Sequence, residues 1–561
     1  MRPSLNLRNL LQSETAIRRI ELGTGAILIG LIFWRLQYST SAICCGDFDG
    51  YYHIKWSQIL WQSFRHHNFR PTFTWLPLTT LNAHDYADHH FLFHLFQIPF
   101  TFFRDLRFGA KLAAIIFGSL AVFSCYWLLM RYQIRYFLVY LLALLACSDP
   151  FLYRLNMAKA PPFAIIYLVI AIHLLFKMNH WPLVLIASVF TLTYDMFPVL
   201  ILAVFLWVAV IGWTERRFLW RPIMWVLLGT AVGLLINPYF PHNIHLFYEH
   251  LKMKMTASDY STKVGQEWYP YNTWEFLGNS VVACTAMVVG YIAFDPSERE
   301  RSQRPLFFLL FSTALMIMTA RWKRIAEYWP AFAVMFAAFA LQPWLEGGRS
   351  AFSKLPAHVM DELRPFFDRD KPTQPTKEER NKDLWRMAVA VSVGIILVAI
   401  LLINLKQTTS EIANSEENDY YKAGAEWMRS QVVSGQIVFN TDWDDFPRLF
   451  YFDPTHNYVS GLDPNYLYDR DPALSQLYDR ITLGEEQDPG PLIRDRFGAR
   501  YVFTDNDHET FSNRAMESGW FDIVYEDRDC TILHIREEKS KAPPEPGAND
   551  SDHEEPQNNR P

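Results

Sequence analysis

Charged residues are scarce in this chain. Asp, Glu, Lys and Arg make up only 20% of its 561 residues, whereas 50% are hydrophobic and 16% are aromatic. A water-soluble domain carries about 25% charged residues. No part of the sequence is strongly basic and the net charge is −6, which argues against a nucleic-acid partner. The composition predicts a protein that crosses the membrane several times and carries a soluble part.

Cysteine is also scarce, and no CxxC pair is present, which excludes a zinc ribbon and a disulfide framework. The six cysteines are Cys44, Cys45, Cys125, Cys147, Cys284 and Cys530. Cys44 and Cys45 adjoin an acidic motif and are compatible with a redox site. Two small residues at a helix end are the simpler interpretation.

Long apolar runs are what the sequence does contain. A membrane-crossing helix needs about 20 mostly apolar residues, and about eleven runs approach that length. They lie near 22–41, 112–130, 136–148, 162–176, 181–193, 196–213, 222–236, 278–294, 305–320, 327–344 and 387–404. Basic residues precede the first run and no small-residue cleavage site ends it, so we expect a retained span rather than a signal peptide.

Basic residues between the runs predict the orientation. With the N-terminus in the cytoplasm, the basic connections at 131–135, 216–221, 299–304 and 345–386 all fall on the cytoplasmic side. Eleven crossings then put the C-terminal part outside the cell membrane. We predict a transmembrane domain over 1–404, an extracytoplasmic domain over 405–536 and a disordered tail over 537–561.

Two regions outside the spans carry secondary-structure signals. In the C-terminal part, "QIVFNTDW", "ARYVFTDN" and "CTILHIRE" read as short strands between helical stretches, which predicts a small α/β domain. In the first external loop, 42–111, "YYHIKWSQILWQSF" and "FLFHLFQIPFTFF" predict two helices at the membrane surface. The alternative for the second is a true span, which would disturb the agreement of the basic loops.

An acidic pair follows the first span, in "GDFDGYYHI". Asp47 and Asp49 can be read in three ways. They could bind a divalent cation through oxygen ligands, or one could be a general base. The third interpretation is a solvated pair in which Asp47 caps the following helix.

Further charged groups gather on the predicted outer side, where charge near a bilayer indicates function. Asp88, His89 and His90 precede His94 by about one helical turn, a spacing that suits a transition metal. Histidines at an interface also hydrogen-bond to headgroups or substrate.

A basic cluster, "TARWKRIAEYWP", lies in a short external loop and breaks the positive-inside rule. Either an anionic partner such as a lipid phosphate binds there, held by Arg321 and Arg324, or the predicted topology slips by one span.

Four stretches together resemble a known family: "GDFDGYYHIKWSQ", "YADHHFLFH", "TARWKRIAEYWPAFAV" and "NTDWDDFPRLFYF". They are similar to the first acidic motif, an Asp-His-His pattern, the donor-phosphate segment and the acceptor motif of the oligosaccharyltransferase catalytic subunit. The layout resembles integral-membrane glycosyltransferases of the GT-C fold. The predicted fold is therefore a multi-pass α-helical GT-C-like membrane protein of about eleven spans with a small C-terminal α/β extracytoplasmic domain.

The resemblance implies roles for particular residues. Asp47 or Asp49 would be the catalytic carboxylate, and Arg154, Arg321 and Arg324 would hold the donor phosphate. The accessory and acceptor-side residues would be Asp88, His89, His90, Asp195, Glu267, Asp442, Trp443, Asp444 and Asp445. Mg²⁺ or Mn²⁺ could assist, with Asp49 and Asp195 as its ligands.

The function that this resemblance implies is transfer of a sugar or oligosaccharide from a polyprenyl-phosphate or polyprenyl-diphosphate donor. The acceptor would be a glycan, lipid or protein at the outer face of the cell (inner) membrane. The alternatives are a polymerase or ligase of surface polysaccharide and a multi-pass transporter. A transporter favours charges near mid-span and broken helices in repeats, whereas here the charges gather at the external ends.

Overall fold

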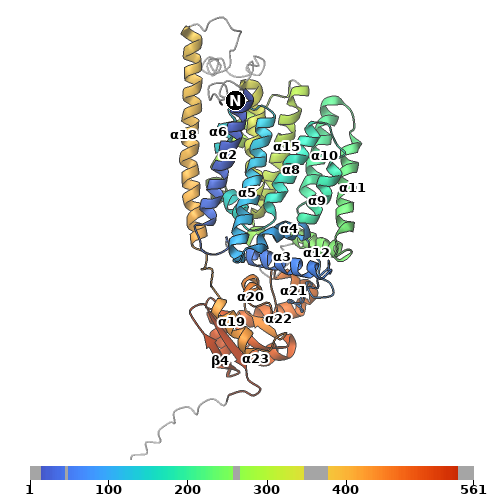
Figure 1. Ribbon diagram of the computed structural model, residues 1–561, viewed down its shortest axis with the longest axis vertical. Coiled ribbons are helices and arrows are strands. Elements are labelled where there is room, and N and C mark those ends of the chain that lie inside the picture. The colour runs from blue at the N-terminus through green and yellow to red at the C-terminus, as the bar shows by residue number, and fades with distance from the viewer. Residues whose placement is uncertain (1–13, 45–47, 257–265, 298, 346–376, 541–561) are drawn as a thin grey trace, which may run out of the picture.

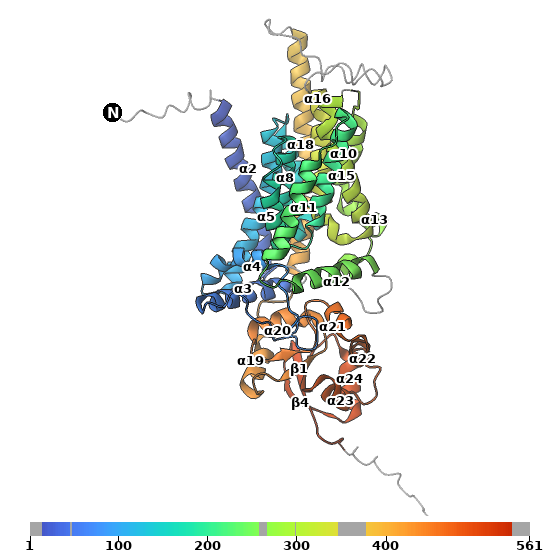
Figure 2. The same ribbon diagram turned by 90° about the vertical axis from the view of Figure 1, so that its right-hand side faces the viewer.

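The computed structural model describes residues 14–44, 48–256, 266–297, 299–345 and 377–540. The helices of the apolar runs lie side by side in a bundle, and a region that contains a sheet sits at one end of it (Figures 1 and 2). Asp47, Cys45 and the predicted tail beyond residue 540 lie outside the described residues.

Every apolar run of the sequence contains a helix. These helices are α2 (Glu14–Gln37), α5 (Leu106–Arg131), α6 (Phe137–Leu145), α8 (Pro161–Phe176), α9 (Leu183–Thr193), α10 (Pro198–Glu215), α11 (Trp220–Ile236), α14 (Val281–Ala293), α15 (Arg299–Arg321), α16 (Trp329–Leu345) and α18 (Lys377–Ala413). The last one starts inside the segment predicted as a cytoplasmic loop, earlier than the apolar run from which it was inferred.

By length and composition, five helical segments can cross a membrane: 19–37, 106–131, 198–215, 301–321 and 388–413. Two bent pairs qualify as broken spans, α6 with α7 (Asp149–Asn156) at 76° and α13 (Thr273–Asn279) with α14 at 85°. Helices α8, α9, α11 and α16 are apolar but shorter. The number of crossings and their orientation stay predictions.

The outer surface of the bundle fits a lipid environment. On α18, Ile395, Ile396, Leu402 and Ile403 are each about 60% exposed, which in water would leave a long apolar stripe unburied. Between α9 and α11, Gly229 and Gly233 allow close contact, because a Cβ at either would meet a carbonyl oxygen of α9 within 2.7 Å. Small residues at helix contacts are typical of membrane bundles.

Two short helices lie across the end of the bundle that faces the sheet (Figure 1). They are α3 (Asp49–Arg65) and α4 (Phe91–Gln97), the latter continued by the 3₁₀ turn η1 (Ile98–Phe102). Helix α12 (His242–Thr256) also lies at this end (Figure 2), followed in sequence by the turn η2 (Gln266–Trp268). After α15, the turn η3 (Lys323–Glu327) leads into α16.

The sheet has five strands in the order β2-β1-β3-β5-β4. Strand β1 (Ile437–Asn440) pairs in parallel with β2 (Asn457–Tyr458) and β3 (Ala499–Asp505). Strand β5 (Cys530–Ile535) is antiparallel to β3 and to β4 (Phe521–Glu526). The three stretches predicted as strands contain β1, β3 and β5.

Helices and turns surround this sheet. They are α19 (Lys422–Gln431), η6 (Trp443–Asp445), α20 (Phe446–Phe452), α21 (Asn465–Arg470), α22 (Pro472–Thr482), α23 (Pro489–Leu492), the π turn η7 (Ile493–Phe497) and α24 (Glu509–Ser518).

The segment between α3 and α4 joins the bundle to the sheet region. Trp75 donates its indole N–H to the carbonyl of Pro454, at 2.7 Å, and its own carbonyl accepts the backbone N–H of Tyr458 at 2.8 Å. Trp56 and Phe73 belong to one hydrophobic cluster with residues of α20. This shared core holds the two regions together at the site described next.

Candidate functional site

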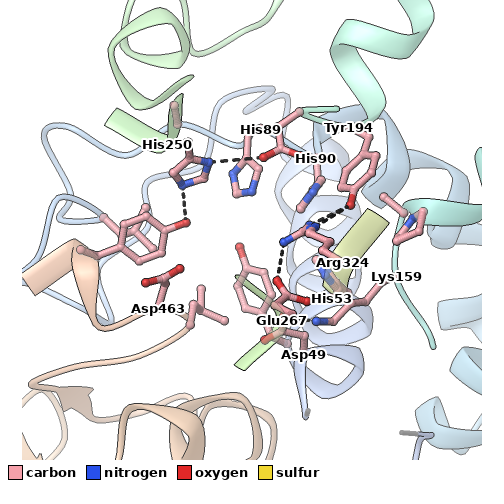
Figure 3. Close-up of a pocket in the computed structure, with 18 of the residues that line it drawn as sticks. Asp49, His53, His89, His90, Lys159, Tyr194, His250, Glu267, Arg324 and Asp463 are labelled. Atoms are coloured by element: carbon pink, nitrogen blue, oxygen red, sulfur yellow. Dashed lines mark hydrogen bonds and ion pairs between the residues drawn. The ribbon is translucent and has the colours of Figure 1, made fainter. Parts of the chain in front are cut away.

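A cavity of about 110 Å³ lies where the end of the bundle meets the sheet region. Its walls come from α3, the turn before α4, the connections after α7 and α9, α12, the η2 and η3 turns, and the segment around α21 (Figure 3). Segments distant in the sequence therefore converge here, and most of the groups that face the cavity carry charge or hydrogen-bonding capacity.

The acidic motif supplies the first wall. Asp49 is the first residue of α3, where a carboxylate is stabilised by the helix dipole. Its Oδ2 lies 2.8 Å from Nζ of Lys159, which comes from the segment between α7 and α8. Both side chains are mostly buried, and both line the cavity. The structure thus pairs the predicted catalytic carboxylate with a cation.

Arg324 is held in a fixed orientation by the opposite wall. Its Nη1 donates to Glu267 Oε1 at 2.6 Å, and its Nη2 donates to the hydroxyl of Tyr194 at 2.7 Å. Arg154 binds the other oxygen of Glu267 at 3.0 Å and Glu327 at 3.1 Å. Burial alone raises the pKa of Glu267, but the two arginines outweigh it and hold that pKa well below its ordinary value.

The third wall pairs a histidine with an acid and a phenol. His250 of α12 places Nδ1 3.6 Å from Asp195 Oδ2, and its Nε2 lies 2.8 Å from the hydroxyl of Tyr466. Tyr466 belongs to α21, and Asp463 just before it also lines the cavity. Burial raises the pKa of Asp463. The sheet region therefore contributes to the cavity.

Asp88 lies behind this cavity rather than on its wall. Its carboxylate accepts the indole N–H of Trp56 at 3.0 Å, the backbone N–H of His90 at 2.9 Å and Nδ1 of His94 at 2.7 Å. Burial raises its pKa, but the contact with His94 and the hydrogen bond from Trp56 outweigh this effect, so the pKa lies below its ordinary value. Asp88 is thus engaged by protein donors, and the transition-metal alternative stays a prediction.

The predicted site residues divide into three groups. Those on the cavity wall are Asp49, His89, His90, Asp195, Glu267 and Arg324. Arg154 and Asp88 lie one contact behind it. Arg321 does not line this cavity: it is exposed in the last turn of α15, and Trp322 then adopts an extended conformation that separates it from Arg324.

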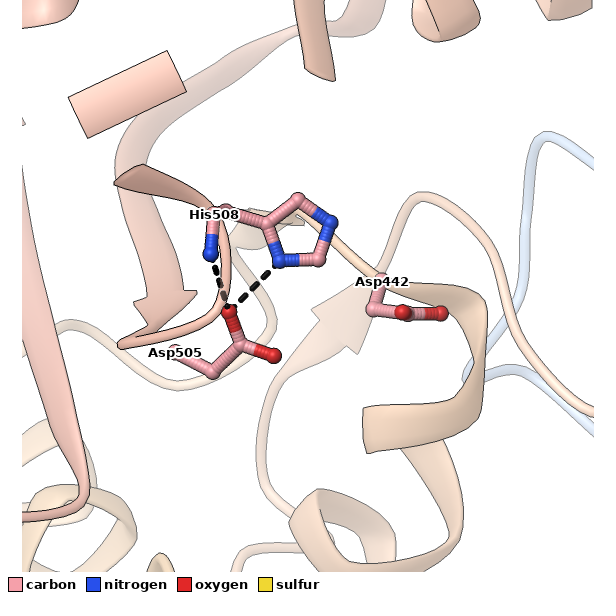
Figure 4. Close-up of side chains that lie close together, drawn as sticks. All are labelled: Asp442, Asp505 and His508. Atoms are coloured by element: carbon pink, nitrogen blue, oxygen red, sulfur yellow. Dashed lines mark hydrogen bonds and ion pairs between the residues drawn. The ribbon is translucent and has the colours of Figure 1, made fainter. Parts of the chain in front are cut away.

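The predicted acceptor residues Asp442, Trp443, Asp444 and Asp445 are not on the cavity wall. Trp443, Asp444 and Asp445 form η6, and Asp442 caps it, at the carboxyl end of β1. Asp442 lies there near Asp505 and His508, with ligand atoms within 4.8 Å of one another (Figure 4). His508 Nδ1 and Asp505 Oδ1 are 2.5 Å apart. Asp445, three residues after Asp442, is buried, and its carboxylate accepts a hydrogen bond from the hydroxyl of Tyr421 at 2.7 Å.

The cavity does not assemble the predicted metal site. A divalent cation needs several oxygen ligands at once. Among the described residues, neither Asp49 nor Asp195 belongs to a group of three His, Cys, Asp or Glu donors that lie close together, and Asp49 already pairs with Lys159. The described residues therefore do not gather Asp49 and Asp195 into one donor set, and Mg²⁺ or Mn²⁺ binding stays a prediction.

Sequence reasoning did not select several wall residues: His53, Lys159, Tyr194, His250 and Asp463. Two signals were available. His53 follows Asp49 by one helical turn inside the quoted acidic motif, and Tyr194 immediately precedes Asp195. Lys159, His250 and Asp463 stand in stretches where nothing in the local pattern points to the cavity.

No family model and no curated protein sequence matches the chain. Solved structures do match. The Archaeoglobus fulgidus oligosaccharyltransferase aligns over 92% of this chain and 74% of its own, with a TM-score of 0.59 and 13% identity. ArnT from Cupriavidus metallidurans, bound to undecaprenyl phosphate, aligns over 93% and 98%, with a TM-score of 0.52 and 12% identity.

The mycobacterial arabinofuranosyltransferase AftD aligns over 92% of this chain but 40% of its own, with a TM-score of 0.50 and 14% identity. At such low identity these likenesses establish the fold. The fold that the resemblance implied is therefore confirmed, and several helices are long and apolar enough to cross a membrane.

Proposed function

We propose that the protein is a membrane glycosyltransferase that transfers a sugar or oligosaccharide from a polyprenyl-phosphate or polyprenyl-diphosphate donor to an acceptor at the outer face of the membrane. The observation that carries this proposal is the cavity in which Asp49, Lys159 and the fixed guanidinium of Arg324 meet at the end of an apolar bundle. The shared fold with ArnT, which was solved with undecaprenyl phosphate bound, supports the class of donor.

Arg324 and Lys159 are the groups suited to the leaving phosphate. An arginine presents a planar set of donors that matches phosphate oxygens. Arg324 is already oriented by Tyr194 and Glu267, so little reorganisation accompanies charge development on the leaving oxygen. Glu267 also pairs with Arg154, so its charge stays neutralised when Arg324 shares its donors with phosphate.

Asp49 is suited to the acceptor. In the reaction, the bond from the anomeric carbon to the phosphate oxygen breaks and its electron pair stays on phosphate. The acceptor oxygen or nitrogen forms the new bond to that carbon and loses its proton. A carboxylate that accepts a hydrogen bond from the acceptor aligns its lone pair for attack.

The acceptor class stays open between a glycan, a lipid and a protein. A polysaccharide polymerase or ligase would use the same donor and differ only in acceptor, so product analysis by mass spectrometry after deletion of the gene distinguishes these. A transporter requires neither Asp49 nor chemistry at the cavity.

The test is binding of undecaprenyl phosphate to the protein in lipid nanodiscs, measured by native mass spectrometry. Arg324→Gln removes the guanidinium and should weaken binding about tenfold or more, as expected for loss of a charged hydrogen bond. Arg321→Gln tests the other arginine of the motif and should change the affinity less than twofold.

Arg480→Gln is the matched control, since Arg480 is an exposed arginine of the sheet region that pairs with Glu486. It should bind as the unmodified protein does. Equal affinity of the Arg324→Gln variant and the control, or loss of binding in Arg321→Gln alone, would contradict the assignment of the phosphate site.

A further inference from the structure

Three buried side chains form a hydrogen-bonded chain that ends at the cavity. Asp88, His94 and His53 are 2%, 1% and 3% exposed. Asp88 Oδ2 lies 2.7 Å from His94 Nδ1, and His94 Nε2 lies 2.8 Å from His53 Nδ1. His53 is also part of the cavity wall, beside Asp49 and Glu267 (Figure 3).

The order of the contacts places the protons once both imidazoles are taken as neutral. An ionised carboxylate only accepts hydrogen bonds, so His94 donates from Nδ1, and in the neutral ring its Nε2 carries a lone pair. His53 then donates from Nδ1. A neutral imidazole holds one N–H, so His53 Nε2 also carries a lone pair, and it makes no hydrogen bond to another described residue. The chain therefore presents a proton acceptor on the cavity wall.

We propose that Asp88, His94 and His53 form a proton relay for the transfer reaction. This inference rests on the proposed function. His53 is the catalytic residue that receives the proton of the acceptor, and His94 and Asp88 are positioning residues that orient it and stabilise the charge. The arrangement is that of a base oriented by a second group, extended by one imidazole.

The step balances without a further reactant. As the acceptor's O–H or N–H bond breaks, an Nε2–H bond forms on His53. The Nδ1–H bond of His53 breaks while an Nε2–H bond forms on His94. The transferred positive charge then rests on the His94 imidazolium, which is paired with the Asp88 carboxylate. The proton returns along the same path to the leaving phosphate or to water.

The ion pairs favour His53 over Asp49 as the proton acceptor. A proton on Asp49 would remove its ion pair with Lys159, whereas a proton on His94 creates an ion pair with Asp88. Burial above all holds the pKa of His53 well below its ordinary value, so its imidazole is neutral near pH 7. The lowered pKa also makes it a weak base, and passing the charge to His94 beside Asp88 offsets that weakness.

The groups around His53 also define what else titrates nearby. His90 lies with its ring centroid 5.4 Å from that of His53, and burial likewise lowers its pKa. Asp49 faces the cavity from α3, the helix that also carries His53. Lys159 faces it from the segment between α7 and α8. Because all of these groups titrate or carry charge, the tautomer of His53 is a sharper observable than a pH profile.

The first experiment reads the tautomer directly and needs no substrate. The full-length protein is labelled with ¹⁵N-histidine in proteoliposomes, and the His53 signals in its solid-state NMR spectrum are assigned by their loss in His53→Asn. We expect a protonated Nδ1 and an unprotonated Nε2. Asp88→Asn should mix the two tautomers, whereas His66→Gln, at an exposed position after α3, should leave them unchanged. A proton on Nε2, or no response to Asp88→Asn, would overturn the relay.

The second experiment separates a relay from simple orientation. His94→Gln keeps a polar atom near His53 Nδ1 but cannot take up a proton. Turnover is measured as release of undecaprenyl phosphate from undecaprenyl-linked sugars isolated from the source cells. We expect kcat to fall by about 10²-fold or more, with KM and the affinity for undecaprenyl phosphate within twofold. Unchanged kcat would overturn the relay.

The two failures are distinguishable. If the unmodified protein neither binds undecaprenyl phosphate nor releases it from such sugars, the proposed function fails, and the catalytic role of His53 fails with it. If transfer proceeds but His53 shows the opposite tautomer, the relay alone is wrong and the glycosyltransferase assignment stands.

Discussion

The cavity and the carboxyl edge of the sheet use similar acidic residues to opposite electrostatic effect. At the cavity, carboxylates alternate with cations: Lys159 faces Asp49, and Arg324 and Arg154 share Glu267. At the sheet edge, Asp442, Asp445 and Asp505 gather. Among the described contacts their partners are His508, the hydroxyl of Tyr421 and backbone N–H groups, with no lysine or arginine.

The pKa shifts follow this difference in surroundings. The arginines hold the pKa of Glu267 down, whereas burial and then the charges of Asp505 and Asp442 raise the pKa of Asp445 well above its ordinary value. At the cavity Glu267 therefore stays ionised beside its arginines, and these charges can bind an ionic ligand. At the sheet edge the fold favours a protonated, neutral Asp445. A carboxylate cluster alone does not identify a site for an anionic donor.

The largest expected effect comes from removing the charge of Asp49. Asp49→Asn should lower turnover of an undecaprenyl-linked sugar by about 10²-fold or more, because it removes the carboxylate that aligns the acceptor. Affinity for undecaprenyl phosphate should stay within twofold. Asp522→Asn, at an exposed acid of the sheet region, is the control. Full activity of the Asp49→Asn variant would contradict a role for this carboxylate in aligning the acceptor.

The next largest effect is expected on stability, when Glu267, the carboxylate shared by Arg154 and Arg324, is neutralised. Glu267→Gln leaves Arg154 and Arg324 without their common carboxylate and should cost about 3 kcal/mol of unfolding free energy, as for one broken buried pair. Glu275→Gln is the matched control, because Glu275 pairs with Lys323 in a far more exposed position and should cost less than about 1 kcal/mol. Denaturation of both variants in detergent measures the difference, and equal costs would refute the buried network.

The two regions should respond to acidification with opposite signs. The pKa values of His53 and His90 are lowered in the fold, so the unfolded chain binds these protons first. Stability around the cavity is then lost as the pH falls below about 6.5, by roughly 1.4 kcal/mol per pH unit for each histidine.

The sheet edge should gain stability over the same change. The pKa of His508 is raised, since the hydrogen bond and charge of Asp505 outweigh burial, and the pKa of Asp445 is raised as well. Both groups bind protons more readily folded than unfolded, so their contributions are lost as the pH rises. Hydrogen exchange at pH 7.5 and pH 5.5, corrected for intrinsic rates, should show protection moving in opposite directions. Parallel changes would contradict the comparison.

The smallest effect is expected at Asp445. Its raised pKa means that the fold favours a neutral side chain there, so Asp445→Asn should change the stability by less than about 1 kcal/mol at pH 5. At pH 8 the variant should be at least as stable as the unmodified protein, because it no longer has a charge to bury. Thermal unfolding at the two pH values measures this. A large loss at both would show that the carboxylate itself is required.

Much of the fold follows from local pattern. Apolar runs predict the helices because a segment in lipid must satisfy its backbone within itself. Strands β1, β3 and β5 are predicted because Val, Ile and Phe alternate with turn residues. Strand β2 is too short to give such a pattern, and β4 exposes Ile523 and Val524 at the edge of the sheet.

The site is predictable only where its residues sit in a recognisable motif. Asp49 and Arg324 stand in stretches that resemble family motifs. Arg321 shares its stretch with Arg324, yet it points elsewhere because α15 ends between them. Lys159 and Asp463 lie in connections between elements and line the cavity, which no local pattern indicates. Asp442 to Asp445 resemble an acceptor motif in sequence but lie away from the cavity.

The sequence by itself determined the long apolar helices, the acids after the first apolar run and the basic cluster far downstream, because hydrophobicity and charge are properties of each segment. Only the tertiary structure decided which cation meets which carboxylate, and that a histidine chain reaches the cavity from Asp88. Such pairings depend on distances of a few ångströms between segments hundreds of residues apart, and the electrostatic energy of a pair depends on that separation and on burial.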